Sequence, residues 1–281
     1  MDIEILKNHI QQSLNEDIQS GDYSSISCID SSAQRKVKLV AKQEGVLCGI
    51  DVFCMVFEQV DSSVKIEKYF KDGDKIHYGD ILLRISGNAR NLLSAERTAL
   101  NYIQLMSGIA TTTNEYVSLL KGMHTKLLDT RKTTPTLRMI EKYSVKIGGG
   151  ENHRFGLFDM IMLKDNHIDF AGGIQQAITK TNQFLKDNNL HLKIEIEVRD
   201  FEELNQVLAT GGVDRIMLDN FSVEDLKKAV EIINHRYETE ASGGINKNTL
   251  VEYASSGVDY ISVGALTHHI SALDISLLAD E

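Results

Sequence analysis

Residues 192–245 read LKIEIEVRDFEELNQVLATGGVDRIMLDNFSVEDLKKAVEIINHRYETEASGGI, and this stretch decides the fold. It contains three short apolar runs, at 192–198, 215–218 and 237–240, separated by segments of helical length. Short buried strands that alternate with helices are typical of a parallel sheet. The pattern therefore predicts consecutive strand–helix units across this part of the chain.

The same alternation extends in both directions along the chain. Further short apolar runs occur at 126–130, 159–163 and 260–263, so that six strands are expected. This many strand–helix units favour a closed or nearly closed (β/α) barrel, and a doubly wound sheet is the alternative. Either fold opens the carboxyl ends of its strands on one side, where binding sites gather.

The chain before residue 105 has a different pattern. Lys36–Lys42 alternates polar and apolar residues as a strand does, and Arg90–Met106 has the length and spacing of a helix. Residues 72–87, DGDKIHYGDILLRISG, place glycines between short apolar runs, which predicts a β-hairpin. We therefore expect an α+β domain over residues 1–105 and the strand–helix domain over residues 106–267.

Composition and charge exclude several classes of protein. The 281 residues are 42% hydrophobic and 25% charged, which is ordinary for a globular protein. The net charge of -10 opposes nucleic-acid binding, because phosphate backbones require a basic surface. No apolar stretch reaches the roughly 18 residues of a membrane span. Three scattered cysteines, Cys28, Cys48 and Cys54, form no zinc or disulfide pattern, which predicts a cytoplasmic protein.

Charged and polar residues occur at or just beyond the ends of all six expected strands. One such residue is usually part of a solvated loop, but six consecutive strands that end in this way predict a site. The residues are Arg131, Lys132, Lys164, Asp165, Asn166, His167, Glu195, Glu197, Asp219, Asn220, Glu240, Ser242, Gly243, Gly244 and Gly264.

The segment 131–154, RKTTPTLRMIEKYSVKIGGGENHR, is basic although the whole chain is acidic. Thr134 is a candidate helix cap, followed by Pro135 in the first turn, and Gly148 is expected to end the helix. Three basic residues of this helix are expected to face solvent: Arg138, Lys142 and Lys146. The four basic residues on either side of the helix are candidates for holding an anion: Arg131, Lys132, His153 and Arg154.

Two other groups of residues suggest ligand contacts. Ser242, Gly243 and Gly244 resemble a phosphate cradle, since glycines let backbone N–H groups approach phosphate oxygens at the start of a helix. Glu197 and Asp219, on neighbouring strands, are candidates for binding a divalent cation such as Mg²⁺. Alternatively, these two carboxylates are partners of Lys132 and Lys164.

Several motifs together resemble quinolinate phosphoribosyltransferase, also called nicotinate-nucleotide pyrophosphorylase (carboxylating). The similarity covers nearly the whole chain, from about residue 16 to residue 277. Its motifs are LLSAERTALN (92–101), DTRKTTPTLRMIEKYSVKIGGGENHR (129–154), KDNHI (164–168), LDNF (218–221) and EASGGI (240–245). The sequence departs from the family pattern at Gln19 and at Thr136, where the family has glycine.

The resemblance implies a fold and an assembly. The fold is an N-terminal α/β sandwich followed by an incomplete (β/α) barrel, with a C-terminal tail, 268–281, that returns to the first domain. The assembly is a homodimer with shared active sites, in which the N-terminal domain of one subunit covers the barrel of the other. Arg97 would then serve the partner's site.

The resemblance also implies an activity, the transfer of phosphoribosyl from phosphoribosyl pyrophosphate to quinolinate with loss of CO₂. This reaction gives nicotinate mononucleotide for NAD biosynthesis. Arginine forks match carboxylates, so the candidates for the quinolinate carboxylates are Arg97, Arg131 and Arg154, with His153 beside them. The expected catalytic residues, which meet the phosphates, ribose and Mg²⁺, are Lys132, Lys164, Glu197 and Asp219. The expected 5′-phosphate site is Ser242, Gly243, Gly244 and Gly264.

Three other functions are alternatives to this one. Nicotinate phosphoribosyltransferase, or a related protein linked to molybdenum transport, would need fewer cations for a second carboxylate. A lipoyl or biotinyl carrier would need a modifiable lysine at a hairpin tip, and residues 72–87 offer only Lys75, without the usual flanking residues. A barrel aldolase would use Lys164 as a Schiff-base lysine, which needs an apolar pocket.

Overall fold

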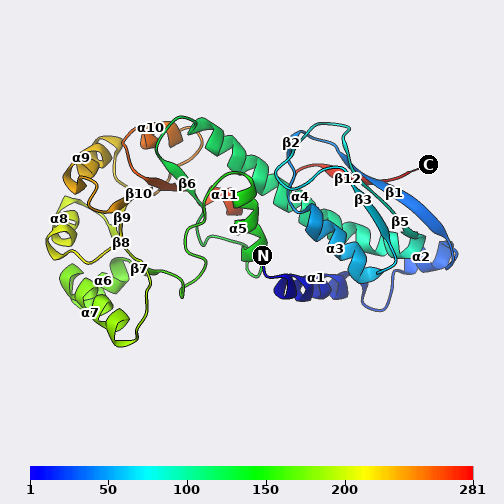
Figure 1. Ribbon diagram of the computed structural model, residues 1–281, viewed down its shortest axis with the longest axis horizontal. Coiled ribbons are helices and arrows are strands. Elements are labelled where there is room, and N and C mark those ends of the chain that lie inside the picture. The colour runs from blue at the N-terminus through cyan, green and yellow to red at the C-terminus, as the bar shows by residue number, and fades with distance from the viewer. Residues whose placement is uncertain (281) are drawn as a thin grey trace. The chain divides into compact units, whose positions relative to one another are not determined.

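The computed structural model describes residues 1–280, which form two compact units. The first unit comprises Met1–Asn114, Met139–Gly149 and the chain from His269 onward, and the second comprises Glu115–Arg138 and Gly150–His268. Residue 281, the last of the predicted tail 268–281, lies outside the described residues. Figure 1 shows the elements of both units.

The first unit is built on a four-stranded antiparallel sheet of order β12-β1-β5-β3. Its strands are β1 (Gln34–Ala41), β3 (Lys65–Lys68), β5 (Ile81–Asn88) and β12 (Ile275–Ala279), and a separate pair is formed by β2 (Gly45–Val46) and β4 (Lys75–Ile76). Its helices are α1 (Ile3–Ile18), α2 (Tyr23–Cys28), α3 (Ile50–Val60), most of α4 (Ala89–Leu119) and most of α5 (Arg138–Ile147). The predicted α+β class of this half is confirmed.

Aliphatic side chains fill the core of this unit. Leu39, Leu83 and Ile85 of the sheet are buried, as are Phe53 and Phe57 of α3, whose rings lie 5.1 Å apart. Figure 1 shows α3 and α4 running along this sheet. Burying each of these side chains contributes roughly 1.5–3 kcal/mol to folding.

The predicted hairpin over residues 72–87 is wrong. β4 pairs with β2, whereas β5 pairs with β1 on one edge and with β3 on the other. Both edges of β5 are therefore occupied, so no edge is left for β4. The turn between β4 and β5, which includes Gly79 at a φ of 93°, leads the chain from one sheet into the other.

Helices α4 and α5 differ from their predicted forms. α4 continues 13 residues beyond the predicted end at Met106. α5 begins at Arg138, because Pro135 and its neighbours form a turn before it. Lys146 is exposed as predicted, but Lys142 is only 1% exposed, because residues 139–149 pack inside the first unit.

The two departures from the family pattern share a backbone feature. Gln19 has a φ of 42° and Thr136 a φ of 70°, which is the left-handed region that glycine occupies without steric cost. A residue with a Cβ atom pays roughly 1–2 kcal/mol to adopt this conformation. Both residues therefore adopt a backbone conformation typical of glycine although each carries a side chain.

The second unit contains a six-stranded parallel sheet of order β6-β11-β10-β9-β8-β7. Its strands are β6 (Lys126–Leu128), β7 (Ile161–Leu163), β8 (Ile194–Val198), β9 (Arg215–Asp219), β10 (Glu238–Ser242) and β11 (Tyr260–Ser262). Its helices are α6 (Asp165–Ala171), α7 (Ile174–Asp187), α8 (Phe201–Thr210), α9 (Val223–Ile233), α10 (Leu250–Ala254) and α11 (Ala265–His268). In Figure 1 α8, α9 and α10 lie outside the curved sheet.

This sheet is curved but not closed. Among the described residues, its two edge strands, β6 and β7, do not pair with each other. The expected incomplete barrel is therefore confirmed, and the fully closed barrel that the pattern also allowed is not. All six predicted strands are present at the predicted places. Among residues 1–280, no helix is both long and apolar enough to cross a membrane.

Candidate active site

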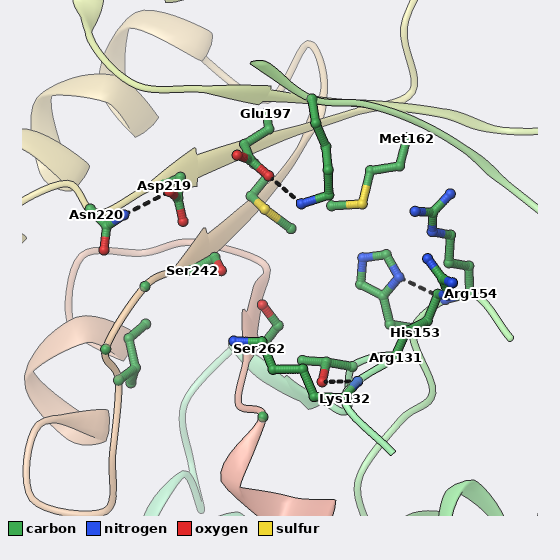
Figure 2. Close-up of a pocket in the computed structure, with 17 residues that line it drawn as sticks. Arg131, Lys132, His153, Arg154, Met162, Glu197, Asp219, Asn220, Ser242 and Ser262 are labelled. Carbon is green, nitrogen blue, oxygen red and sulfur yellow. Dashed lines mark hydrogen bonds and ion pairs between the residues drawn. The ribbon is translucent and has the colours of Figure 1, made fainter. Parts of the chain in front are cut away.

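A cavity of about 640 Å³ opens at the carboxyl ends of the six parallel strands (Figure 2). The residues around it come from the end of every strand of the sheet, as expected for a (β/α) architecture. They are Thr130, Arg131, Lys132, His153, Arg154, Met162, Lys164, Glu197, Met217, Asp219, Asn220, Ser242, Gly243, Gly244, Ile245, Ser262 and Gly264.

One side of the cavity is basic, and we call Arg131, Lys132, His153 and Arg154 the basic wall. Burial, and then the charge of Arg131, lower the pKa of Arg154. The guanidinium of Arg154 donates to the carbonyl of Met160 at 3.2 Å. The Nε of Arg131 is buried and has no hydrogen-bond partner among the described residues. Two neighbouring guanidiniums, one with an unused buried donor, suit a ligand with carboxylates.

The opposite side is acidic, and we call Glu197 and Asp219 the acidic wall. These residues end the adjacent strands β8 and β9. Burial, and then the charge of Glu197, raise the pKa of Asp219. Lys164 reaches Glu197 at 2.7 Å between Nζ and Oε2, and the amide of Asn220 donates to Asp219 Oδ2 at 2.7 Å. The two carboxylates repel each other, so a divalent cation or another positive charge would be stabilised between them.

A short glycine segment forms the third part of the cavity. Gly243 has a φ of 101° and Gly244 a φ of 63°, and the backbone around Gly244 faces open space. A Cβ atom on Gly243 would come within 2.1 Å of Asn220 Oδ1, so only glycine fits there. The predicted helix start directly after this segment is wrong, because α10 begins only at Leu250 and is five residues long. Any phosphate held here would therefore meet loop N–H groups.

Gly264 follows β11 and lies against Lys132. A Cβ atom on Gly264 would come within 3.0 Å of Lys132 Cδ, so the glycine leaves room for the lysine side chain. The hydroxyl of Thr267 donates to the Lys132 carbonyl at 2.8 Å, and the Lys132 N–H donates to Thr130 Oγ1 at 3.0 Å. These bonds fix the backbone from which the lysine extends.

Beneath the basic wall lies a buried cluster of charged side chains. His153 Nε2 is 2.9 Å from Glu195 Oε2 and 3.6 Å from Glu240 Oε2. Arg215 contacts Glu240 at 3.1 Å from the side away from the cavity, and its guanidinium stacks on the Tyr260 ring. Burial, and then the charge of Glu195, raise the pKa of Glu240 to about 8. Glu195 and Glu240 are both fully buried.

Every residue predicted to bind substrate except Arg97 lines this cavity. Arg97 is exposed on α4 in the first unit. Of the other predicted strand-end residues, Asn220 lines the cavity, and five do not: Asp165, Asn166, His167, Glu195 and Glu240. Five lining residues were not predicted: Thr130, Met162, Met217, Ile245 and Ser262. The side chain of Lys164 is 42% exposed and ion-paired, which is not the apolar surrounding that the aldolase alternative requires.

Comparison with known proteins assigns the chain to a family. Two family models match it, the quinolinate phosphoribosyl transferase N-terminal domain over residues 22–107 and the C-terminal domain over residues 109–278. A relative named quinolinate phosphoribosyltransferase [decarboxylating] 2, mitochondrial, from Nicotiana glauca is 44% identical, and the match covers 98% of this chain and 82% of the relative. A probable nicotinate-nucleotide pyrophosphorylase [carboxylating] from Bacillus subtilis is 42% identical over 97% of this chain and 92% of its own length.

Solved structures give the same assignment. The crystal structure of NadC from Streptococcus pyogenes has a TM-score of 0.94 and 42% identity, covering 100% of this chain and 99% of that one. Human nicotinic acid phosphoribosyltransferase, at 11% identity and a TM-score of 0.62, shares the fold only. The motifs, the strand-end cavity and these matches agree, and the chain belongs to the quinolinate phosphoribosyltransferase family.

Proposed function

We propose that the protein transfers phosphoribosyl from phosphoribosyl pyrophosphate to quinolinate, with loss of CO₂. The products are nicotinate mononucleotide and pyrophosphate, as the names of its relatives imply. The observation that supports this most directly is a single cavity with a basic wall on one side and an acidic wall on the other. A planar dicarboxylate fits the first wall, and the ribose with its developing positive charge fits the second.

Each group of residues has a proposed role in this reaction. Arg131 and Arg154 bind the quinolinate carboxylates, and His153 lies beside them in the basic wall. Lys132 and Lys164 meet the pyrophosphate, where point charges suffice. The backbone N–H groups from Ser242 to Gly244, with Gly264 opposite, hold the 5′-phosphate.

The acidic wall acts on the bond that breaks. Glu197 and Asp219 engage the ribose hydroxyls and stabilise positive charge at C1′ as pyrophosphate departs. The pyridine nitrogen of quinolinate attacks C1′, and the resulting ring cation accepts the electrons that the departing CO₂ leaves behind. The protein supplies position and charge here and forms no covalent bond to the substrate.

The residues of the acidic wall fit a Mg²⁺ ion that arrives with phosphoribosyl pyrophosphate. The fit rests on the donor chemistry, since Glu197 and Asp219 offer oxygen ligands, and burial and then the charge of Glu197 raise the pKa of Asp219. A bound Mg²⁺ would neutralise charge on the departing pyrophosphate. Lys164, which now contacts Glu197, would still reach the phosphates beside it.

We further propose a homodimer with shared sites in the cytoplasm. Arg97 supports the first part, because it is an exposed cation on an otherwise largely apolar helix segment and lies outside the cavity of its own second unit. In the dimer it would add a third guanidinium to the partner's basic wall. The free thiols of Cys28, Cys48 and Cys54 are compatible with a reducing compartment.

The direct test is to incubate the purified protein with quinolinate, phosphoribosyl pyrophosphate and Mg²⁺. Nicotinate mononucleotide and pyrophosphate should form in equal amounts, measured by chromatography. Nicotinate in place of quinolinate is the matched control, because it lacks the second carboxylate that the arginine pair would bind. Equal turnover of nicotinate would overturn the assignment of quinolinate as substrate.

A further inference from the structure

The buried cluster beneath the basic wall has no role in the reaction described so far. Glu195 lies on β8 and Glu240 on β10, and Arg215 begins the strand between them. His153 joins this cluster to the cavity, because its ring lines the cavity and also contacts both carboxylates. The cluster therefore lies directly behind the residues that would read the substrate carboxylates.

The hydrogen bonds of His153 define its protonation state. The N–H of Arg154 donates to His153 Nδ1 at 2.7 Å, so Nδ1 must present its lone pair. The hydrogen of a neutral ring then lies on Nε2, which is 2.9 Å from Glu195 Oε2. His153 also donates its own N–H to Asp129 Oδ1 at 2.8 Å. These contacts hold both the ring and the backbone that leads into Arg154.

The charge of the cluster is balanced within the protein. Burial raises the pKa of both carboxyls, Glu195 and Glu240, and the positive charge of Arg215 opposes both shifts. The ligand atoms of His153, Glu195 and Glu240 lie within 4.8 Å of one another, which is also a spacing for a metal ion. Arg215, 3.1 Å from Glu240, already supplies the positive charge that a metal would bring.

We propose that Glu195 is a positioning residue for carboxylate binding: its carboxylate, 2.9 Å from His153 Nε2, holds the His153–Arg154 backbone in place and so directs the Arg154 guanidinium into the cavity. This inference rests on the proposed function, because quinolinate is the ligand whose binding it affects. Removing this carboxylate would take away the closer of the two carboxylate contacts of a buried ring nitrogen, and the ring and the following residue would lose their fixed position. Phosphoribosyl pyrophosphate, which binds elsewhere in the cavity, should be little affected.

Kinetics of three variants test the proposal. Glu195→Leu removes the acceptor and should raise the KM for quinolinate by about 10–100-fold, with the KM for phosphoribosyl pyrophosphate changed less than about threefold. Glu195→Gln keeps an acceptor oxygen and should restore most of the quinolinate affinity. Glu238→Gln is the matched control, because Glu238 also pairs with Arg215 but does not contact His153. Equal losses for both substrates, or a Gln variant as weak as the Leu variant, would overturn the positioning role.

A spectroscopic measurement tests the same idea without turnover. In long-range ¹H–¹⁵N spectra of the whole protein, the signals that disappear in His153→Asn belong to His153. They should show the Nε2–H form in the wild type, in Glu195→Gln and in Glu238→Gln, and they should shift or broaden in Glu195→Leu, because the ring loses its 2.9 Å contact. If Glu195→Leu does not fold, the wild-type and Gln spectra still decide. The Nδ1–H form in the wild type overturns the proposal, as does one bound metal ion per chain that is lost in Glu240→Gln.

This spectrum also separates the positioning role of Glu195 from the proposed function. A wild-type protein that does not turn over quinolinate would contradict the proposed function. If the His153 signals of that protein still depend on Glu195 as described, Glu195 positions His153 and the ligand of the site is a different molecule.

Discussion

Each wall of the cavity places groups of like charge next to each other, positive in the basic wall and negative in the acidic wall. In the basic wall, burial and then the charge of Arg131 lower the pKa of Arg154, and in the acidic wall, burial and then the charge of Glu197 raise the pKa of Asp219. The walls differ in how far the protein itself neutralises them. Glu197 and Asp219 have close partners in Lys164 and Asn220, whereas the buried Nε of Arg131 has none among the described residues.

This difference separates what each wall needs from a ligand. The acidic wall is partly compensated before any ligand binds, so it can exchange Lys164 for a cation and change little in shape. The basic wall has no comparable anion in the cavity and is completed only by a bound carboxylate. We therefore expect the acidic wall to affect turnover and the basic wall to affect affinity. The first two of four predictions test this division, and the other two test the partner subunit's contribution and the buried layer below the basic wall.

The largest expected effect comes from removing divalent cations. Excess EDTA should abolish turnover, because Glu197 and Asp219 would then face the pyrophosphate substrate without the charge that neutralises it. The rate of product formation is the measurement, and added Mg²⁺ should restore it. Full turnover in EDTA would show that the acidic wall works without a metal.

The next effect concerns the basic wall. Arg131→Ala should weaken quinolinate binding by roughly 2–5 kcal/mol, the usual cost of removing one partner of a desolvated charge pair. Calorimetric titration with quinolinate gives the affinity, and a thermal melt checks that the fold persists. Lys146→Ala is a suitable control, because Lys146 is an exposed cation on α5 that does not line the cavity. An unchanged affinity would mean that Arg131 is only a loop residue.

A smaller effect tests whether the basic wall is completed by a second subunit. Arg97→Ala and Lys164→Ala homodimers should each be nearly inactive, but a mixed dimer contains one site with both lesions and one with neither. Equal mixing places about half of the dimers in the mixed class, so roughly a quarter of wild-type activity should return. With subunit exchange demonstrated by mass spectrometry, no return of activity would assign Arg97 to its own subunit.

The smallest effect comes from the layer below the basic wall. The pKa of Glu240 is raised from 4.5 to about 8 in the folded protein, so the folded state binds more protons than the unfolded chain between these values. The free energy of unfolding should therefore fall as the pH rises from about 5 to about 8. Glu240→Gln removes this titration and should have a shallower slope, to which Glu195, whose pKa is also raised, still contributes. Melting temperatures across this range provide the measurement, and equal slopes for both proteins would contradict the buried neutral carboxyl.

Much of this architecture follows from local sequence patterns. Apolar runs such as Ile194–Val198 and Arg215–Asp219 are short, bounded by turns and repeated, so the strands of the second unit were predictable. The polar residues that follow them were predictable as a site for the same reason, since parallel strands end on one side of a sheet. The family resemblance then supplied the incomplete barrel.

Long-range contacts limited the remaining predictions. The pairing of β4 with β2 depends on which edges of β5 are already occupied, and residues 72–87 contain no sign of this. The burial of Lys142 depends on the packing of residues 139–149 in the first unit. Glu195 alternates with Ile194 and Ile196 and so shares a face with Glu197, but its partners His153 and Arg215 are distant in sequence.

The close approach of Gly243 to Asn220 has a consequence for how the family can vary. A Cβ atom at 243 would lie 2.1 Å from Asn220 Oδ1 and 2.9 Å from the Asn220 backbone nitrogen, which is itself bonded to the Ser242 carbonyl at 2.9 Å. Shortening the side chain at 220 would remove only the first of these clashes. A residue other than glycine at position 243 therefore requires the loop to shift, even when the side chain at position 220 is short. We therefore expect the loops that contain positions 220 and 243 to vary together, and not independently, among members of the family.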